Sequence, residues 1–441
     1  MPERIILPRL IDAVLGLLEL IRNGEDLELF VLDYMDAFKQ LRVHPEERRF
    51  LAGSATIDGI PGFFAYLTVL FGVVSGPLLW GRLAAFVCRA SISLFEPGSL
   101  ALQCYVDDPL FGVSGPKAQR AAVVGIMLLF WEALGLKMSW TKGARGQSVS
   151  WIGAEITVIR DDDGNPIGVS VTITQEKADK LESEVKELCA QTFIGRKRLQ
   201  AFAGLGAWVA SVVPVLRPFV QMLWAATAST PSGEETQAKV SAARVRKPLE
   251  WLSKFVEKRL TTLPRCFYAA EPETSPTIGF DASPVGGGAW LKLVGDTDDE
   301  SPPDLYSHFE WDRADEQLLG AKRGDPGSQA IWEGFALLLA ISTWIDSLPL
   351  ARCRLELRGD AQGVLQAILA RRGKCTTINR IIAEIQLLLG ETMYDIYAAH
   401  VWSEDNDRAD KLSRVPEGAA IPRDCSEVVF SPVVRRPWTF L

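Results

Sequence analysis

The sequence predicts a mixed α/β protein built from two or three domains. Three observations support this fold class. The chain has 441 residues, which is too long for one hydrophobic core. Strand-like and helix-like segments alternate at both ends of the chain, and the middle is helical. A proline-rich stretch at Ala270–Pro276 marks the clearest domain boundary.

The first third of the chain mixes strands and helices. Leu10, Val14, Leu17, Leu18 and Ile21 recur at helical spacing, which predicts a helix within the first 30 residues. The following segments show strand or helix patterns: strand Leu29–Asp33, strand Phe63–Phe71, helix Leu78–Phe95, hairpin Leu102–Val113, helix Ala118–Leu134, strand Val149–Val158 and strand Gly168–Ile173.

The middle of the chain is predicted to be helical. Its helices are Lys177–Leu188, Gly195–Val213, Val215–Ala228 and Ala238–Lys258. After the proline-rich stretch, the expected order is strand, strand, an acidic loop at Gly295–Asp304, strand, helix, strand, helix, strand and helix. That order is typical of an α/β unit.

Composition narrows the function classes. Apolar residues make up 48% of the chain and charged residues 23%, as in ordinary globular proteins. The seven cysteines form no C-x-x-C pair, which argues against a zinc knuckle or a disulfide framework and favours an intracellular location, in cytoplasm or nucleus. No signal peptide is predicted. The uncharged run Pro61–Gly81 contains glycine and proline breakers, so no membrane span is expected.

Charge gives a mixed signal about nucleic acid. The net charge of −8 is unusual for a nucleic-acid-binding protein. Eight Lys and Arg residues nevertheless gather between Lys239 and Arg265, against only Glu250 and Glu257. Such a stretch can follow a phosphate backbone. A solvated helix face explains it equally well.

The most informative motif is Tyr105-Val106-Asp107-Asp108, where two adjacent carboxylates interrupt an apolar, strand-like segment. Ionised neighbours repel, and a half-buried strand is a costly place for them. A hairpin tip gives them water and room for a divalent cation, which takes carboxylate oxygens as ligands. A simple turn is the alternative interpretation of two aspartates in a row.

A cation site needs a further carboxylate, and Asp33 supplies it at the end of an apolar strand. Asp33, Asp107 and Asp108 together are able to hold two Mg²⁺ (or Mn²⁺) ions, one activating a primer hydroxyl and the other neutralising the leaving pyrophosphate. Asp36 is a weaker candidate because it is also placed to cap the turn that follows.

The order of these motifs resembles reverse transcriptases of LTR and DIRS-like retrotransposons. The segments LDYMDAF, LFGVVSGP, YVDD, LGLKMSWTK and WIGAEI follow one another over roughly residues 5 to 220. The resemblance implies that Asp33, Asp107 and Asp108 are the catalytic residues, with template-primer and dNTPs as partners. It also implies supporting roles for Tyr34, Phe71, Gly72, Gly76 and Lys142 at the nucleotide, and for Trp151, Ile152 and Gly153 at the primer.

Two of these implied roles are specific. Tyr34 lies next to the first aspartate, where bulk would exclude a sugar 2′-hydroxyl, and Lys142 would lie near the triphosphate. The usual LPFG motif reads Val69-Leu70-Phe71-Gly72, without its proline. The chain starts only about 30 residues before Asp33, so the fingers segment is expected to be absent or truncated.

Four more carboxylates occupy strand ends and helix starts after the proline-rich stretch. Asp281 ends an apolar strand, Glu333 lies on an apolar helix, Asp360 follows a strand, and Asp410 lies in the segment NDRADKLSR. Each carboxylate taken alone can also be explained as a helix cap, a turn residue or a surface residue. Together they are able to bind two metal ions that activate water for attack on a phosphodiester. Gly286–Gly288 are predicted to form a tight hairpin turn.

This second set resembles the RNase H domain of retroelement polymerases over about residues 276 to 415. The resemblance implies that Asp281, Glu333, Asp360 and Asp410 are the metal ligands and that RNA–DNA hybrid is the substrate. His400 is predicted to be structural. Between the two sites, Arg196–Trp208 and Pro214–Phe219 resemble the thumb and connection of the same elements, with a basic edge that would face the duplex.

The complete prediction is an α+β palm and thumb polymerase of the right-hand type, with truncated fingers, followed by an α/β RNase H-like domain. The expected parts are fingers and palm at 1–158, thumb and connection at 159–269, the RNase H-like domain at 270–415, and a tail at 416–441. Two alternatives remain: a chain active only as a ribonuclease, and a non-catalytic nucleic-acid-binding relic.

Overall fold

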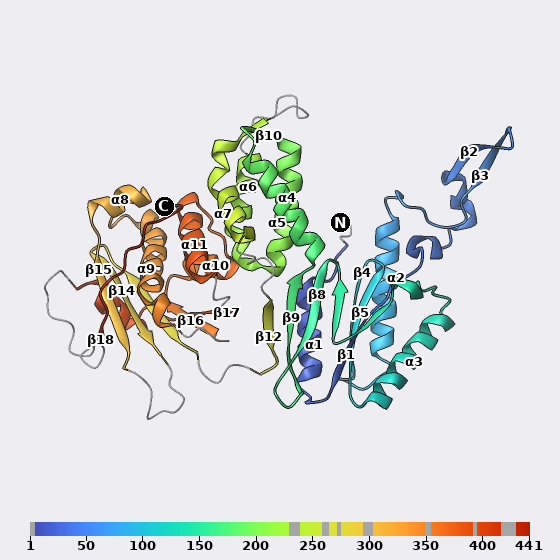
Figure 1. Cartoon of the computed structure of the whole chain (residues 1–441), viewed down its shortest axis with the longest axis horizontal. Coiled ribbons are helices and arrows are strands. Elements are labelled where there is room, and N and C mark those ends of the chain that lie inside the picture. The colour runs from blue at the N-terminus through green and yellow to red at the C-terminus, as the bar shows by residue number, and fades with distance from the viewer. Residues whose placement is uncertain are drawn as a thin grey trace. The chain divides into compact units, whose positions relative to one another are not determined.

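The computed structural model describes residues 5–228, 239–257, 264–270, 275–293, 303–348, 354–390, 395–415 and 429–441. The chain forms two compact units (Figure 1). The first contains residues 1–174 and Pro264–Glu271, and the second contains residues 175–263 and 272–441. The predicted boundary after residue 158 falls inside strand β8 (Ala154–Arg160), which is paired on both of its edges. The sheet therefore continues past that point.

Two four-stranded sheets form the first unit. Their strand orders are β4-β5-β1-β6 and β12-β9-β8-β7. The strands are β1 (Leu27–Val31), β4 (Leu100–Tyr105), β5 (Asp108–Ser114), β6 (Ala144–Gly146), β7 (Ser148–Trp151), β8, β9 (Pro166–Ile173) and β12 (Arg265–Tyr268). The helices are α1 (Leu10–Ile21), α2 (Gly76–Ile92) and α3 (Lys117–Ala133), with 3₁₀ turns at Ala37–Gln40, Pro45–Phe50 and Trp140–Lys142.

The helices of this unit cover both faces of the first sheet. Phe111 on β5 packs edge-on against Trp131 of α3, at 6.3 Å between ring centroids. The next residue, Gly112, faces α1: a side chain there would meet Leu17 at 2.4 Å. Because neighbouring strand residues point to opposite faces, α1 lies on the face opposite to α3.

One predicted strand is wrong. Of Phe63–Phe71, only residues 63–65 lie in a strand, at the end of β3 (Ile60–Ala65), which pairs with β2 (Ala52–Ile57) in a separate hairpin. Asp58 and Gly59 between them both have positive φ, which is the geometry of a two-residue hairpin turn. All of β3 is exposed, so no alternating burial was available to mark its limits.

The second unit begins with helices. These are α4 (Gln175–Cys189), α5 (Arg196–Val212), α6 (Arg217–Ala228) and α7 (Arg246–Glu257), with short strands β10 (Phe193–Gly195) and β11 (Lys239–Ser241) and 3₁₀ turns at Pro214–Leu216 and Ala242–Arg244. The helix predicted from Ala238 starts only at Arg246, because Lys239–Ser241 pair with β10. Lys258 and Arg259 lie outside the described residues.

A six-stranded sheet forms the rest of this unit, in the order β17-β16-β13-β14-β15-β18. Its strands are β13 (Thr277–Ala282), β14 (Gly286–Lys292), β15 (Leu305–Glu310), β16 (Arg354–Gly359), β17 (Asp395–His400) and β18 (Val429–Phe430). Its helices are α8 (Arg313–Leu319), α9 (Gln329–Trp344), α10 (Gln362–Ala370), α11 (Thr376–Leu389) and α12 (Asp407–Ser413), with 3₁₀ turns at Pro326–Ser328 and Ile345–Ser347. The predicted alternation is confirmed, while the proline-rich stretch and the acidic loop fall largely outside the described residues.

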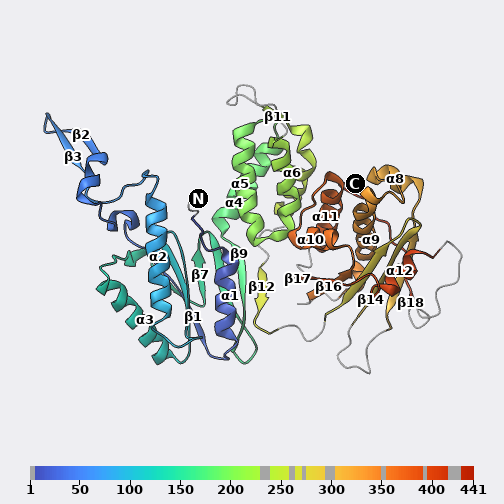
Figure 2. The same ribbon diagram turned by 180° about the vertical axis from the view of Figure 1, so that it is seen from behind.

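Helix α9 lies at the centre of the core of this unit. Its side chains pack with those of β13, β14, β16, α10 and α11. Figure 2 shows α9 beside α11 in this unit. Within the described part of the chain, one helical span, Pro326–Ser347, is long and apolar enough to cross a membrane, and 72% of its most apolar 18-residue stretch is buried in the fold. The uncharged run at Pro61–Gly81 forms part of β3, a loop and the start of α2.

The glycine triplet Gly286–Gly288 is not a turn, which corrects the prediction. These glycines start β14, and the turn is formed by the residues before them. Glycine is required here because other parts of the chain approach closely. A side chain on Gly287 would meet Phe309 at 2.0 Å, and one on Gly288 would meet the backbone of Ser413 at 2.3 Å.

Candidate active sites

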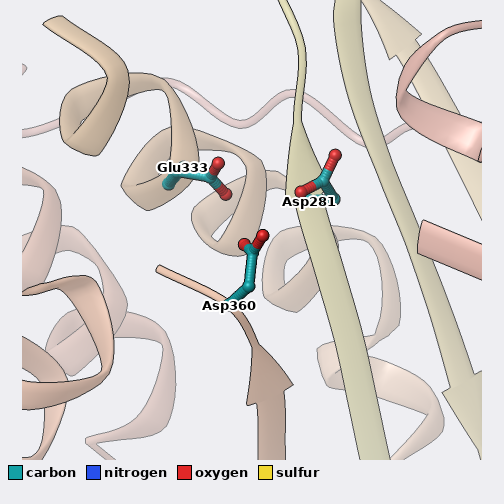
Figure 3. Close-up of side chains that lie close together, drawn as sticks. All are labelled: Asp281, Glu333 and Asp360. Carbon is teal, nitrogen blue, oxygen red and sulfur yellow. The ribbon is translucent and has the colours of Figure 1, made fainter. Parts of the chain in front are cut away.

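Three carboxylates meet in the second unit. Asp281 lies near the end of β13, Asp360 directly follows β16, and Glu333 projects from the first turns of α9. One carboxylate oxygen of each lies within 4.8 Å of one from each of the others (Figure 3). The parallel pairing of β13 with β16 brings the two aspartates to the same edge of the sheet.

Hydrogen bonds hold each carboxylate in place. The Gln329 amide donates to Glu333 Oε1 at 2.8 Å and to the Ala282 carbonyl at 2.7 Å. The Ser413 hydroxyl donates to Asp281 Oδ2 at 2.8 Å, and the Ser403 hydroxyl donates to Asp360 Oδ2 at 2.6 Å. The donors come from outside the strands that carry the aspartates, so the site depends on the tertiary fold.

The cluster is electrostatically strained in the absence of a cation. Burial, reinforced by the charge of Asp281, raises the pKa of Glu333 to about 9. Burial also raises the pKa of Asp281 to about 6, despite the hydrogen bond from Ser413. Glu333 Oε2 is buried and has no hydrogen-bond partner among the described residues. A free carboxylate oxygen in a group of three carboxylates fits a hard divalent cation such as Mg²⁺.

Asp410 is the predicted ligand that does not join the cluster. It lies on α12 and forms an ion pair with Arg414, with Oδ1 2.6 Å from Nη2. Its charge still contributes to the raised pKa of Asp281, after burial and the effect of Asp360, so it is nearby. His400 ends β17 and packs edge-on against Trp402, at 5.4 Å between ring centroids.

In the first unit, Asp107 and Asp108 lie at the tip of the β4–β5 hairpin, as predicted. Tyr105 pairs with Asp108, which leaves Val106 and Asp107 as the turn. Val106 has a φ of 57°, in the left-handed region that a two-residue hairpin turn requires. Two indoles fix the turn: Trp80 donates to the Val106 carbonyl at 2.6 Å, and Trp151 donates to the Asp108 carbonyl at 2.9 Å.

Asp33 lies beside this hairpin. It follows β1, and the amide of the next residue donates to the Asp107 carbonyl at 2.8 Å. Its carboxylate forms an ion pair with Lys142, with Nζ 2.7 Å from Oδ2. Burial, then the charges of Asp107 and Asp33, raise the pKa of Asp108 to about 6. The three aspartates are therefore close enough to interact, although they do not form a group as tight as the one around Glu333.

The implied role of Tyr34 is wrong. Its ring is only 1% exposed and packs between Trp80 and Trp131, at 5.3 and 5.5 Å between ring centroids. Tyr34 lies three residues past the end of β1 with its side chain in the core, so it cannot screen a sugar bound at Asp33.

The other residues implied to act at the nucleotide lie on the segment before α2. Phe71 is exposed and its ring contacts Phe38, at 5.0 Å between centroids. Gly72 has a φ of 96°, which favours glycine. Gly76 is the first residue of α2. Ile152 and Gly153, implied to contact a primer, form the turn between β7 and β8, and Asp36 pairs with Lys39 at the surface.

The sequence did not point to Gln329, Ser403 or Ser413. Gln329 lies four residues before Glu333, which places both on one face of α9 and was a usable signal. The two serines carried no such signal, because each reaches an aspartate distant in the sequence.

Among known proteins, only solved structures are similar to this chain. No protein-family model matches the chain, and no curated protein matches it. Its fold is similar to solved structures of a foamy viral protease–reverse transcriptase. The structure of its dRH form in complex with dsDNA has a TM-score of 0.42 and 16% identity, covering 86% of this chain and 57% of that one.

Two further structures of the same viral protein are similar. The complex with dsDNA has a TM-score of 0.41 and 16% identity, covering 85% of this chain and 68% of that one. The complex with RNA/DNA hybrid has a TM-score of 0.41 and 15% identity, covering 96% of this chain and 49% of that one. The chain thus spans about half to two thirds of the length of these proteins.

Proposed function

We propose that this chain cleaves the RNA strand of RNA–DNA hybrids at Asp281, Glu333 and Asp360. The observation that carries the proposal is the convergence of three carboxylates, one with an unpartnered buried oxygen. When bound there, Mg²⁺ or Mn²⁺ would lower the pKa of a water molecule and stabilise charge on a phosphodiester. A pair of ions is expected, with Asp410 as a further ligand once it leaves Arg414.

The residues of the chain have defined tasks in this reaction. The water oxygen attacks phosphorus, one phosphorus–oxygen bond breaks, and the leaving oxygen takes a proton. Gln329, Ser403 and Ser413 hold the carboxylates in the orientation that binding requires. Selectivity for RNA would come from groups that sense the 2′-hydroxyl.

A second activity, RNA-directed DNA polymerisation, is favoured by a separate observation. Asp33, Asp107 and Asp108 interact at a hairpin tip, where burial and then the charges of Asp107 and Asp33 raise the pKa of Asp108. Asp33, Asp107 and Asp108 would hold the metal ions that a primer hydroxyl and a dNTP need. The Lys142 ammonium group forms an ion pair with Asp33. It would exchange this carboxylate for a triphosphate when a nucleotide binds. We therefore propose a retroelement reverse transcriptase with palm, thumb and RNase H parts.

Cleavage tests the first activity. The full chain with Mg²⁺ should cut the RNA of a labelled hybrid and leave the same RNA uncut when single-stranded. Asp360→Asn should reduce this rate at least about 100-fold. Asp405→Asn makes the same chemical change at an exposed position near in sequence to Asp410 and should retain the rate. Equal cleavage by both variants would contradict the proposed site.

Primer extension tests the second activity on the same preparations. Asp107→Asn should abolish extension and retain cleavage, whereas Asp162→Asn, on an exposed turn, should retain both. Cleavage without extension by the unmodified chain would leave the ribonuclease as its activity. Loss of both in folded protein would leave a non-catalytic nucleic-acid-binding relic.

A further inference from the structure

Two adjoining cavities in the second unit form a surface that the two active sites do not use. One, of about 450 Å³, lies between α6, α7 and the start of α11. The other, of about 310 Å³, lies between α5, α6 and the end of α10. Gln221 of α6 lines both, so they adjoin across that helix. We call this surface the basic groove.

Its walls are strongly cationic. The first cavity is lined by Arg244, Lys247, Lys374 and Arg380, and the second by Arg217 and Arg372. No aspartate or glutamate lines either cavity among the described residues. In a chain with a net charge of −8, so many cations without a lining carboxylate require an explanation.

The cations are mostly left without anionic partners. Lys247 donates to the Thr439 carbonyl at 2.7 Å, and Arg217 donates to the Ala210 carbonyl at 3.4 Å. Glu384 lies close to Lys247, but it is buried and accepts the backbone amide of Leu441. Within the described part of the chain, no ion pair is formed by Arg244, Arg372, Lys374 or Arg380.

The guanidinium groups of Arg217 and Arg372 line the same cavity and repel each other. Burial, followed by the positive charge of Arg372, holds the pKa of Arg217 below its usual value. Like charges held close together on different elements raise the free energy of the fold unless an anion binds between them. The buried amide of Asn379 ties α11 to α6 by donating to the Pro218 carbonyl at 3.5 Å, which keeps the two walls in place.

We infer that the basic groove binds the phosphate backbone of a nucleic-acid strand. Cations on both sides of Gln221 suit successive phosphates better than one small anion. Trp224, 38% exposed in the second cavity, offers an aromatic face on which an unpaired base stacks. This inference rests on the proposed function, because it supplies the same hybrid substrate with a binding surface outside both active sites.

A native cysteine allows a test without substitution. Cys375 is exposed and lines the groove, whereas the exposed Cys189 and Cys266 do not. The full chain in EDTA would be treated with iodoacetamide, with and without a hybrid carrying a single-stranded extension. Mass spectrometry would then measure the rate of alkylation of each cysteine. Hybrid should slow alkylation of Cys375 at least about fivefold relative to the other two. Equal rates at all three cysteines would overturn the proposal.

Salt dependence gives a second test. The triple variant Arg244→Gln, Lys374→Gln and Arg380→Gln should bind hybrid at least about tenfold more weakly, and the slope of log affinity against log salt should fall by roughly 2. A control with the same charge change, Lys117→Gln, Lys180→Gln and Arg313→Gln, uses exposed positions outside the groove. It should retain most of the slope. Circular dichroism confirms that both variants are folded.

The outcomes separate this inference from the proposed function. Normal hybrid binding and cleavage by the groove variant, with the salt slope unchanged, would overturn the groove and leave the ribonuclease intact. Protection of Cys375 by inorganic phosphate or a mononucleotide, but not by hybrid, would assign the groove to a small phosphorylated ligand and overturn the nucleic-acid proposal. Failure of the unmodified chain to bind hybrid would overturn both, whereas binding without cleavage would overturn the ribonuclease alone.

Discussion

The amide of Gln329 donates a hydrogen bond to Glu333 Oε1, one helical turn away, and leaves Glu333 Oε2 buried without a partner in the described structure. Gln329 also donates to the carbonyl of Ala282, which neighbours Asp281. A single side chain therefore positions the helix-borne carboxylate against the strand-borne one. The side chains of Glu333, Asp281 and Asp360 point toward one another (Figure 3).

Gln329→Leu should weaken cation binding more than folding. Without the amide, Glu333 loses its orienting bond, so we expect hybrid cleavage to fall by about tenfold and the half-saturating Mg²⁺ concentration to rise. The measurement is a Mg²⁺ titration of the cleavage rate. Gln362→Leu, at an exposed position on α10, is the control. An unchanged Mg²⁺ dependence would exclude a positioning role for Gln329.

The metal-free protein should become less stable as pH rises. The pKa of Glu333 is raised to about 9 by burial and by Asp281, so the folded state holds a proton that the unfolded state releases near pH 4.5. Stability from this group is complete below about pH 4.5 and is lost as pH rises towards 9. Chemical denaturation in EDTA at pH 5, 7 and 9 measures the free energy of unfolding at each pH. We expect a loss on the order of a few kcal/mol.

Two controls accompany this pH series. Glu333→Gln cannot ionise, so its stability should vary much less over the same pH range. Saturating Mg²⁺ should restore stability to the unmodified protein at high pH, because a cation relieves the repulsion among the carboxylates. A rise in stability with pH in EDTA would contradict the assignment of a protonated Glu333.

Tyr34→Phe should leave stability nearly unchanged. The Tyr34 hydroxyl is buried without a hydrogen-bond partner among the described residues, so its removal should change the free energy of unfolding by less than about 1 kcal/mol, or increase it. Tyr34→Ala should cost about 3–5 kcal/mol because it empties the space between two indoles. Chemical denaturation measures both. If Tyr34→Ala, in folded protein, altered the choice of dNTPs over ribonucleotides, the core assignment would be wrong.

Gly288→Ala should disturb both stability and cleavage. The added methyl would meet the Ser413 amide nitrogen at 2.3 Å and the Ala409 carbonyl at 2.5 Å, so α12 would have to move away from β14. We expect a loss of about 2–4 kcal/mol. Cleavage should also fall, because Ser413 holds Asp281. Gly363→Ala on α10, where nothing lies within 4 Å, should be neutral or stabilising.

Several parts of this protein follow from local sequence patterns. The Tyr105–Asp108 hairpin, the helical middle and the alternating strands and helices after residue 276 were predictable, because burial periodicity and adjacent charges are local properties. The placement of Asp281, Glu333 and Asp360 at strand ends and a helix start was also visible. The prediction failed at Phe63–Phe71, because strand β3 ends at Ala65 and is exposed along its whole length, which leaves no alternating burial to mark the strand.

Only the tertiary structure decided which residues meet. It buried Tyr34 between two indoles, drew Gly286–Gly288 into a strand against α12, and brought Ser403 and Ser413 to aspartates distant in the sequence. It also gathered the cations of the basic groove from three helices and their connections. The sequence determined the carboxylates and the elements that carry them. Packing over long sequence separations determined their partners, because those contacts leave no periodic trace along the chain.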